Sequence, residues 1–108
     1  MSKVDDSSPQ KIREAFYAVL EIPGIHRHGE KVFNRLLKAP GHEMTRQALW
    51  AEFGAGPLSL WFGKLCKMVA AELGEPTPKP YALTDTVTVA SGEKALRLKA
   101  RVVEAISS

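Results

Sequence analysis

Residues 45–73 read TRQALWAEFGAGPLSLWFGKLCKMVAAEL, and this stretch predicts two helices joined by a short corner. Thr45 is a suitable N-cap for the first helix, which stops before Gly54. The four residues 54–57 are too few for anything but a tight turn. The second helix, 58–73, has a wide apolar face formed by Leu58, Trp61, Phe62, Leu65, Met68, Val69 and Leu73. A short helix, a corner and a longer helix are therefore expected here.

Two further helices are predicted upstream of this pair. The first spans residues 9–22, because Ser8 can cap it and Pro9 suits the first helical position. The second begins near Gly29 and ends before Pro40. Apolar residues at helical spacing mark one face of each: Ile12, Phe16, Val19 and Leu20, then Val32, Phe33, Leu36 and Leu37. Residues 1–8 are expected to be a disordered lead, and 9–108 a single domain.

Downstream of the pair, the apolar period changes from that of a helix to that of a strand. A proline-rich connector, residues 74–80, forbids a helix and favours an extended chain. The alternation that follows predicts a β-hairpin over 83–102 with a turn at 91–94. Its outer face is expected to carry Thr84, Thr86, Thr88, Arg97, Lys99 and Arg101. A helix over 93–106 also fits the apolar spacing, and 103–106 can turn helical after the hairpin.

The composition is that of one ordinary globular domain. The chain has 108 residues, of which 44% are hydrophobic and 25% charged. No apolar run reaches the roughly 18–20 residues that cross a bilayer, and the polar start lacks a secretory layout. The single cysteine, Cys66, excludes an internal disulfide and a multi-cysteine zinc site. A cytoplasmic protein without membrane contact is expected.

Nothing in the sequence favours catalysis or a bound cofactor. The stretch Gly54-Ala55-Gly56 is followed by Pro57 and has no preceding strand, so it is not a phosphate-binding loop. No nucleophile–base pattern is evident. His26 and His28 lack the spacing of a zinc site and are interpreted as part of a polar loop. We therefore expect no enzyme, no metal and no cofactor.

The positive charge lies mainly in the C-terminal half. The net charge is +3. Between residues 58 and 101 the basic side chains outnumber the acidic ones. The basic residues there are Lys64, Lys67, Lys79, Lys94, Arg97, Lys99 and Arg101, and the acidic ones are Glu72, Glu75, Asp85 and Glu93. This half is the candidate surface for a polyanion.

Residues 31–101 resemble a winged-helix domain, most closely the effector domain of OmpR/PhoB-type transcriptional regulators. The residues that carry the likeness are KVFNRLLKAPG at 31–41, MTRQALW at 44–50, and Phe62, Leu65, Lys67 and Val69 in the longer helix. The chain departs from that family in three ways, one of which is that its hairpin lacks the family's Gly-Tyr ending. The helix 9–22 stands where the family has a four-stranded sheet, and the family's arginine-rich recognition helix is reduced here to Lys64 and Lys67.

The resemblance implies an α+β fold, a small winged helix-turn-helix of three to four helices followed by a C-terminal hairpin wing. It also implies sequence-specific binding of double-stranded DNA for transcriptional regulation, in a bacterial or phage setting. Helix 58–73 would enter the major groove and hairpin 83–102 would act as the wing. The expected DNA-binding residues are Arg46, Ser59, Gly63, Lys64, Lys67, Arg97, Lys99 and Arg101.

An alternative function belongs to a different class. The few cations on helix 58–73 also suit a winged-helix protein-interaction module, an adaptor or anti-activator that does not itself bind DNA. The basic hairpin argues against this alternative, although alternating basic residues on a hairpin also protect an edge strand against aggregation. Because one such module seldom binds DNA tightly alone, we also expect a homodimer or another transcription protein as partner. The apolar face of helix 9–22 is the expected contact, provided that the core does not bury it.

Overall fold

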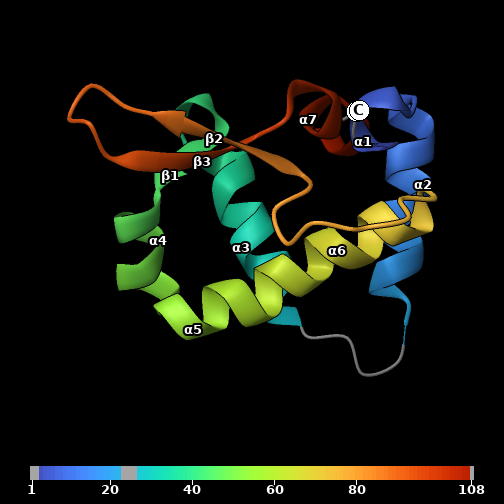
Figure 1. The fold of residues 1–108 in the computed structure, drawn as a ribbon, viewed down its shortest axis with the longest axis horizontal. Helices are drawn as coiled ribbons and strands as arrows, with labels where there is room; N and C mark the ends of the chain where they lie inside the picture. The colour runs from blue at the N-terminus through green and yellow to red at the C-terminus, as the bar shows by residue number, and fades with distance from the viewer. Residues whose placement is uncertain (1–2, 23–26, 108) are drawn as a thin grey trace.

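The computed structural model describes residues 3–22 and 27–107, without the side chains of Arg27, Pro57 and Ser59, and has an α+β fold (Figure 1). The elements in chain order are α1 (Lys3–Asp6), α2 (Pro9–Leu20), α3 (Arg27–Lys38), the 3-10 turn η1 (Pro40–His42), β1 (Glu43–Thr45), α4 (Arg46–Phe53), α5 (Ala55–Pro57), the π-helix η2 (Leu58–Phe62), α6 (Gly63–Glu72), β2 (Thr84–Thr88), β3 (Lys94–Leu98) and α7 (Ala100–Ser107). No helix within these ranges is long and apolar enough to cross a bilayer.

The strands of the described chain form one antiparallel sheet in the order β1-β3-β2. The hairpin β2–β3 was predicted, whereas β1, which precedes α4, was not. Thr84 lies opposite Leu98 and Thr86 opposite Leu96, so these threonines share a face with buried leucines. The expectation that the threonines lie beside Arg97 is wrong. Alternate residues of a strand point to opposite faces, and the register places Arg97 opposite Asp85 instead.

The hydrophobic core fills the space between the helices and one face of the sheet. Phe33 of α3 contacts Phe16 of α2, with 4.6 Å between ring centroids. Leu49, Phe62 and Leu96 contribute buried side chains from α4, η2 and β3. The apolar face of α2 is buried in this core, so the condition set for a partner contact through that face is not met.

Local signals for helix starts are confirmed, and the predicted corner is shorter than expected. The Ser8 and Thr45 side chains accept hydrogen bonds from the backbone N–H groups of Lys11 and Ala48, respectively. The turn is made by Gly54 alone, whose φ of 89° is open to glycine at little cost. Helical backbone resumes at Ala55 and runs through α5, η2 and α6.

The expected disordered lead is wrong for residues 3–7. They form α1 and the turn after it, with Val4 fully buried and the Ser7 hydroxyl donating to the Lys3 carbonyl oxygen at 2.6 Å. Residues 1–2 lie outside the described part. Burial of a valine against the core supplies the free energy that orders so short a helix.

The predicted hairpin 83–102 is too long at its C-terminal end. Its second strand ends at Leu98, and α7 begins at Ala100, so the alternative helix over 93–106 is also wrong for residues 94–98. Alternation of apolar and basic residues continues to Val102, but Val102 and Ala105 are buried together at helical spacing. The packing of α7 against α2 favours the helical period over the alternation of a strand.

Candidate nucleic-acid interface

Lys64 and Lys67 lie on α6 and are exposed to solvent. Neither makes an ion pair or hydrogen bond with the described part of the chain. Both line one open hollow of about 490 Å³. Its other lining residues are Leu60, Gly63, Met68 and Pro80. The structure therefore brings the two predicted α6 lysines onto one surface.

Gly63 does not offer the free backbone that was expected of it. It is buried, and a Cβ at this position would lie 3.4 Å from the Cβ of Pro80. The proline connector therefore covers this point of α6, so the expected exposed backbone at Gly63 is wrong, and its predicted contact with DNA stays a prediction. Ser59 lies in the π-helix η2, and its side chain is outside the described part of the structure.

Arg46, at the start of α4, packs against an aromatic ring. Its guanidinium carbon is 5.1 Å from the centroid of the Tyr81 ring, the geometry of a cation–π contact. Its Nε atom is buried and lacks a hydrogen-bond partner in the described chain. Arg46 thus holds α4 against the segment that leads into β2. Its predicted contact with phosphate stays a prediction.

Arg97, on β3, is paired with an acidic residue of β1. Its Nη2 donates to Glu43 Oε1 at 2.7 Å, and half of the Arg97 side chain remains exposed. Asp85 lies directly opposite Arg97 on its other side, in β2. The Glu43 carboxylate therefore offsets the charge of the guanidinium toward an external anion, whereas the Asp85 carboxylate accepts from Lys99 at 2.9 Å.

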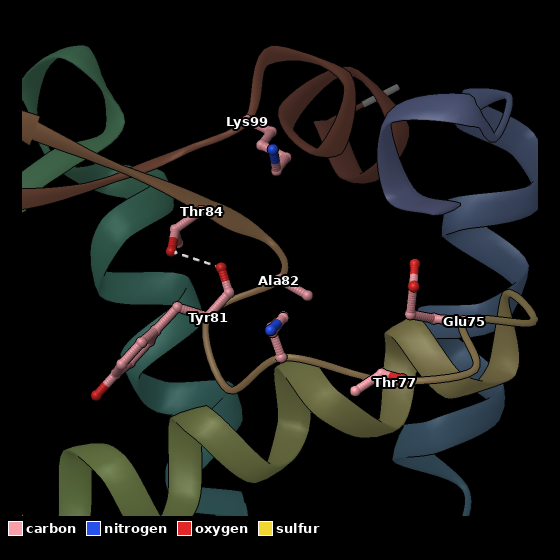
Figure 2. Close-up of a pocket in the computed structure, with 7 residues that line it drawn as sticks. Glu75, Thr77, Tyr81, Ala82, Thr84 and Lys99 are labelled. Carbon is pink, nitrogen blue, oxygen red and sulfur yellow. Dashed lines mark hydrogen bonds between the residues drawn. The ribbon is translucent and has the colours of Figure 1, made fainter. Parts of the chain in front are cut away.

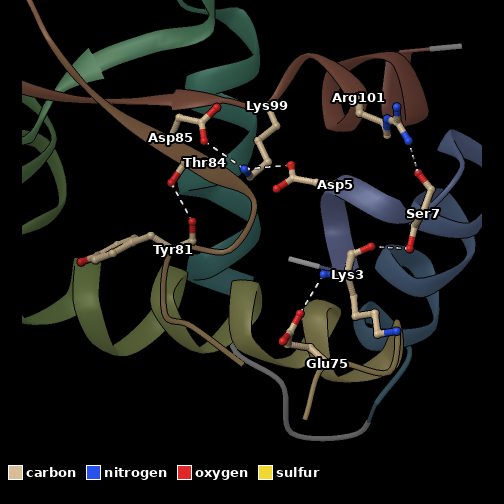
Figure 3. A network of polar contacts seen from close by, with 9 residues as sticks. All are labelled: Lys3, Asp5, Ser7, Glu75, Tyr81, Thr84, Asp85, Lys99 and Arg101. Carbon is tan, nitrogen blue, oxygen red and sulfur yellow. Dashed lines mark hydrogen bonds and ion pairs between the residues drawn. The ribbon is translucent and has the colours of Figure 1, made fainter. Parts of the chain in front are cut away.

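Lys99 joins the end of the hairpin to α1 (Figure 3). Its Nζ donates to Asp85 Oδ1 at 2.9 Å and to Asp5 Oδ1 at 3.0 Å. Burial lowers the pKa of Lys99, but the hydrogen bonds and the charges of Asp85 and Asp5 outweigh it, so the pKa is raised above its ordinary 10.5. The ammonium is therefore used inside the protein, which contradicts its predicted place on an outer face.

Arg101 is not on the wing, because it belongs to α7. Its Nη1 donates to the Ser7 carbonyl oxygen at 2.9 Å (Figure 3). Like Lys99, it fastens the N-terminal segment to the C-terminal half. The expected wing contact by Arg101 is wrong because the hairpin ends three residues before it.

A pocket of about 340 Å³ lies between the proline connector and the start of β2 (Figure 2). It is lined by Glu75, Thr77, Lys79, Tyr81, Ala82, Thr84 and Lys99. Several of these polar groups have internal partners. The Glu75 carboxylate accepts from the backbone N–H of Lys3 at 2.7 Å, and the Thr84 hydroxyl donates to the Tyr81 carbonyl oxygen at 3.0 Å. The Glu75 bond therefore connects the wall of the pocket to α1, and we assign the pocket no ligand.

The sequence indicated the charged residues themselves better than the partners that bind them. Asp85 broke the apolar series of its strand, which was the available signal that a cation lies beside it. No local signal placed Glu43 opposite Arg97 or Pro80 against Gly63. Within residues 3–22 and 27–107, no three His, Cys, Asp or Glu side chains gather where they could hold a metal ion. Comparisons of the chain with protein-family models, curated proteins and solved structures return no match.

Proposed function

We propose that this chain is a winged-helix module that binds double-stranded DNA through α6. Support comes from the chain order α3, α4, α6 and then the β2–β3 hairpin. In helix-turn-helix proteins the second helix of the pair enters the major groove, which is about 12 Å wide. Here that helix is the segment that follows the corner at Gly54.

The observation that carries the proposal is the pair Lys64 and Lys67. Both ammonium groups are exposed on one surface, and no carboxylate of the described chain offsets them. Lysines in this position can bind phosphate or the O6 and N7 atoms of guanine. Regulation of transcription, with the chain cytoplasmic and bound to the nucleoid, is the role that we propose for such binding.

The hairpin contributes less to this proposal than the sequence alone indicated. Arg97 and Lys99 are paired with carboxylates, whereas Lys94 donates to the neutral hydroxyl of Thr88 at 2.9 Å and makes no ion pair within the described chain. We therefore propose Lys94 as the wing contact to phosphate. One such module buries about 600–1,000 Å² on DNA, so we also propose that a second copy or a protein partner adds to the affinity.

Fluorescence anisotropy with a labelled duplex of mixed sequence tests the proposal. Affinity should fall by orders of magnitude between about 50 mM and about 200 mM salt. Lys64→Ala and Lys67→Ala should each weaken binding and lower the salt slope by about one. Lys11 is an exposed lysine on α2, away from the proposed surface. Lys11→Ala is therefore the matched control and should change neither the affinity nor the salt slope. Equal affinity for all four proteins would exclude α6 as the DNA-binding surface.

A second candidate function is protein interaction, favoured by one observation. Leu60 is largely exposed and shares its hollow with Met68 and Pro80. An apolar surface edged by lysines suits a partner segment that is acidic and apolar. The same titration separates the two functions, because an interaction module without DNA binding would not retain the duplex at about 50 mM salt.

A further inference from the structure

Leu60 is an unusual residue to find on the proposed DNA-binding surface. It is 63% exposed, compared with 44% for Trp50 and 43% for Tyr17, the next most exposed large apolar side chains of the described chain. Leaving a leucine in water gives up the free energy that burial of its side chain would supply. Contact with an apolar group of a ligand would recover part of that free energy.

The surroundings of Leu60 indicate what kind of group it would meet. It lies in η2, one turn before the start of α6, and lines the same hollow as Lys64 and Lys67. An apolar side chain is thus placed beside two cations on one surface. Duplex DNA offers the matching arrangement, because its major groove carries the C5-methyl of thymine between two rows of phosphates.

We infer that Leu60 selects thymine at one position of the bound site by contact with its C5-methyl group. This inference rests on the proposed DNA binding and adds a base preference to it. The selection has two physical sources. The leucine side chain gains contact with the methyl group, and at any other base it covers a polar edge that loses water without gaining a partner. Lys64 and Lys67 hold the neighbouring phosphates or guanine.

The test begins with selection of bound duplexes from a random pool by the full chain. The wild-type protein should enrich thymine at one position. That thymine is then replaced by deoxyuridine, which keeps its base pair and lacks only the methyl group. Affinity should fall about fourfold, which corresponds to about 0.8 kcal/mol for one buried apolar carbon.

The variant Leu60→Ala should remove this discrimination, so that thymine and deoxyuridine duplexes bind equally. Ile22→Ala, which shortens another exposed apolar side chain, is the control and should keep the fourfold ratio. Equal binding of the two duplexes by the wild-type protein, or an unchanged ratio in Leu60→Ala, would overturn the inference while leaving DNA binding intact. Absence of binding to any duplex would overturn both this inference and the proposed DNA binding.

Discussion

Arg97 of β3 and Glu43 of β1 lie directly opposite each other, with 2.7 Å between Nη2 and Oε1. The two residues are 54 positions apart in the chain. Asp85 lies opposite Arg97 on the other neighbouring strand, so Glu43, Arg97 and Asp85 form a row of charged residues across the sheet. The cation that was predicted to bind phosphate is thus engaged within the protein. A basic residue on an exposed strand is therefore available to DNA only as far as its neighbours leave its charge uncompensated.

Replacement of Arg97 by alanine should have little effect on DNA binding. The guanidinium is already engaged with Glu43, so Arg97→Ala is expected to change the affinity for a duplex less than twofold, whereas Lys64→Ala reduces the salt slope. The loss of the half-exposed ion pair should lower the free energy of unfolding by about 0.2–1 kcal/mol. Anisotropy titrations and urea unfolding of the same samples measure both effects. A large loss of affinity in Arg97→Ala would show that Arg97 contacts DNA despite its ion pair with Glu43.

Lys99 should make folding stability sensitive to alkaline pH. The pKa of Lys99 is raised in the folded chain above the ordinary 10.5. The contribution of Lys99 to folding stability is therefore complete below about pH 10.5. The contribution is lost as the pH rises through the folded value. Lys99→Met should lower the free energy of unfolding by about 1–2 kcal/mol at pH 7, since it removes hydrogen bonds to two half-exposed carboxylates.

Urea unfolding of wild type and Lys99→Met at pH 7, 9 and 11 measures this difference. The difference between their free energies of unfolding should be constant from pH 7 to 9 and should become smaller at pH 11. A difference that stays the same at pH 11 would show that the charge of Lys99 does not stabilise the joint between α1 and the hairpin.

Gly29 should not tolerate even a methyl group. A Cβ at this position of α3 would lie 2.7 Å from the carbonyl oxygen of Trp61 in η2. Alanine is favoured over glycine in a helix by about 1 kcal/mol, but a backbone oxygen cannot rotate away from the clash. Gly29→Ala should therefore lower the free energy of unfolding by about 1–3 kcal/mol.

The matched control for that substitution is Gly56→Ala. A Cβ there would meet nothing within 4 Å, and the residue lies in α5. Thermal unfolding should show an unchanged or slightly higher Tm for Gly56→Ala and a lower one for Gly29→Ala. A stabilising Gly29→Ala would mean that α3 and η2 separate at little cost.

Cys66 should be unreactive in the folded chain. Burial raises the pKa of its thiol to about 12, above the ordinary 9.0, because the thiolate would lose its hydration. The fraction of thiolate at pH 8 is thereby about a thousandfold lower than for an ordinary cysteine. The buried sulfur is also shielded from reagents. A coloured disulfide reagent should label Cys66 promptly in guanidinium and only at the rate of unfolding in buffer. Rapid labelling in buffer would show that α6 opens locally.

Short-range chemistry determined much of the fold from sequence. The caps at Ser8 and Thr45, the end of α3 before Pro40 and the positive φ of Gly92 in the hairpin turn each depend on residues only a few positions apart. Such signals are legible because the competing local conformations differ by about a kilocalorie per mole at each residue. The exposure of Lys64 and Lys67 followed in the same way from the apolar period of α6.

Tertiary structure alone decided which of the predicted cations remain free. Asp5 binds Lys99 from 94 positions away, and Pro80 closes over Gly63 from the connector. It also decided that Val102 belongs to a helix, because packing on α2 outweighs an alternation that fits a strand equally well. The energies of these contacts depend on distances between segments remote in the chain, and no periodicity along one segment records them.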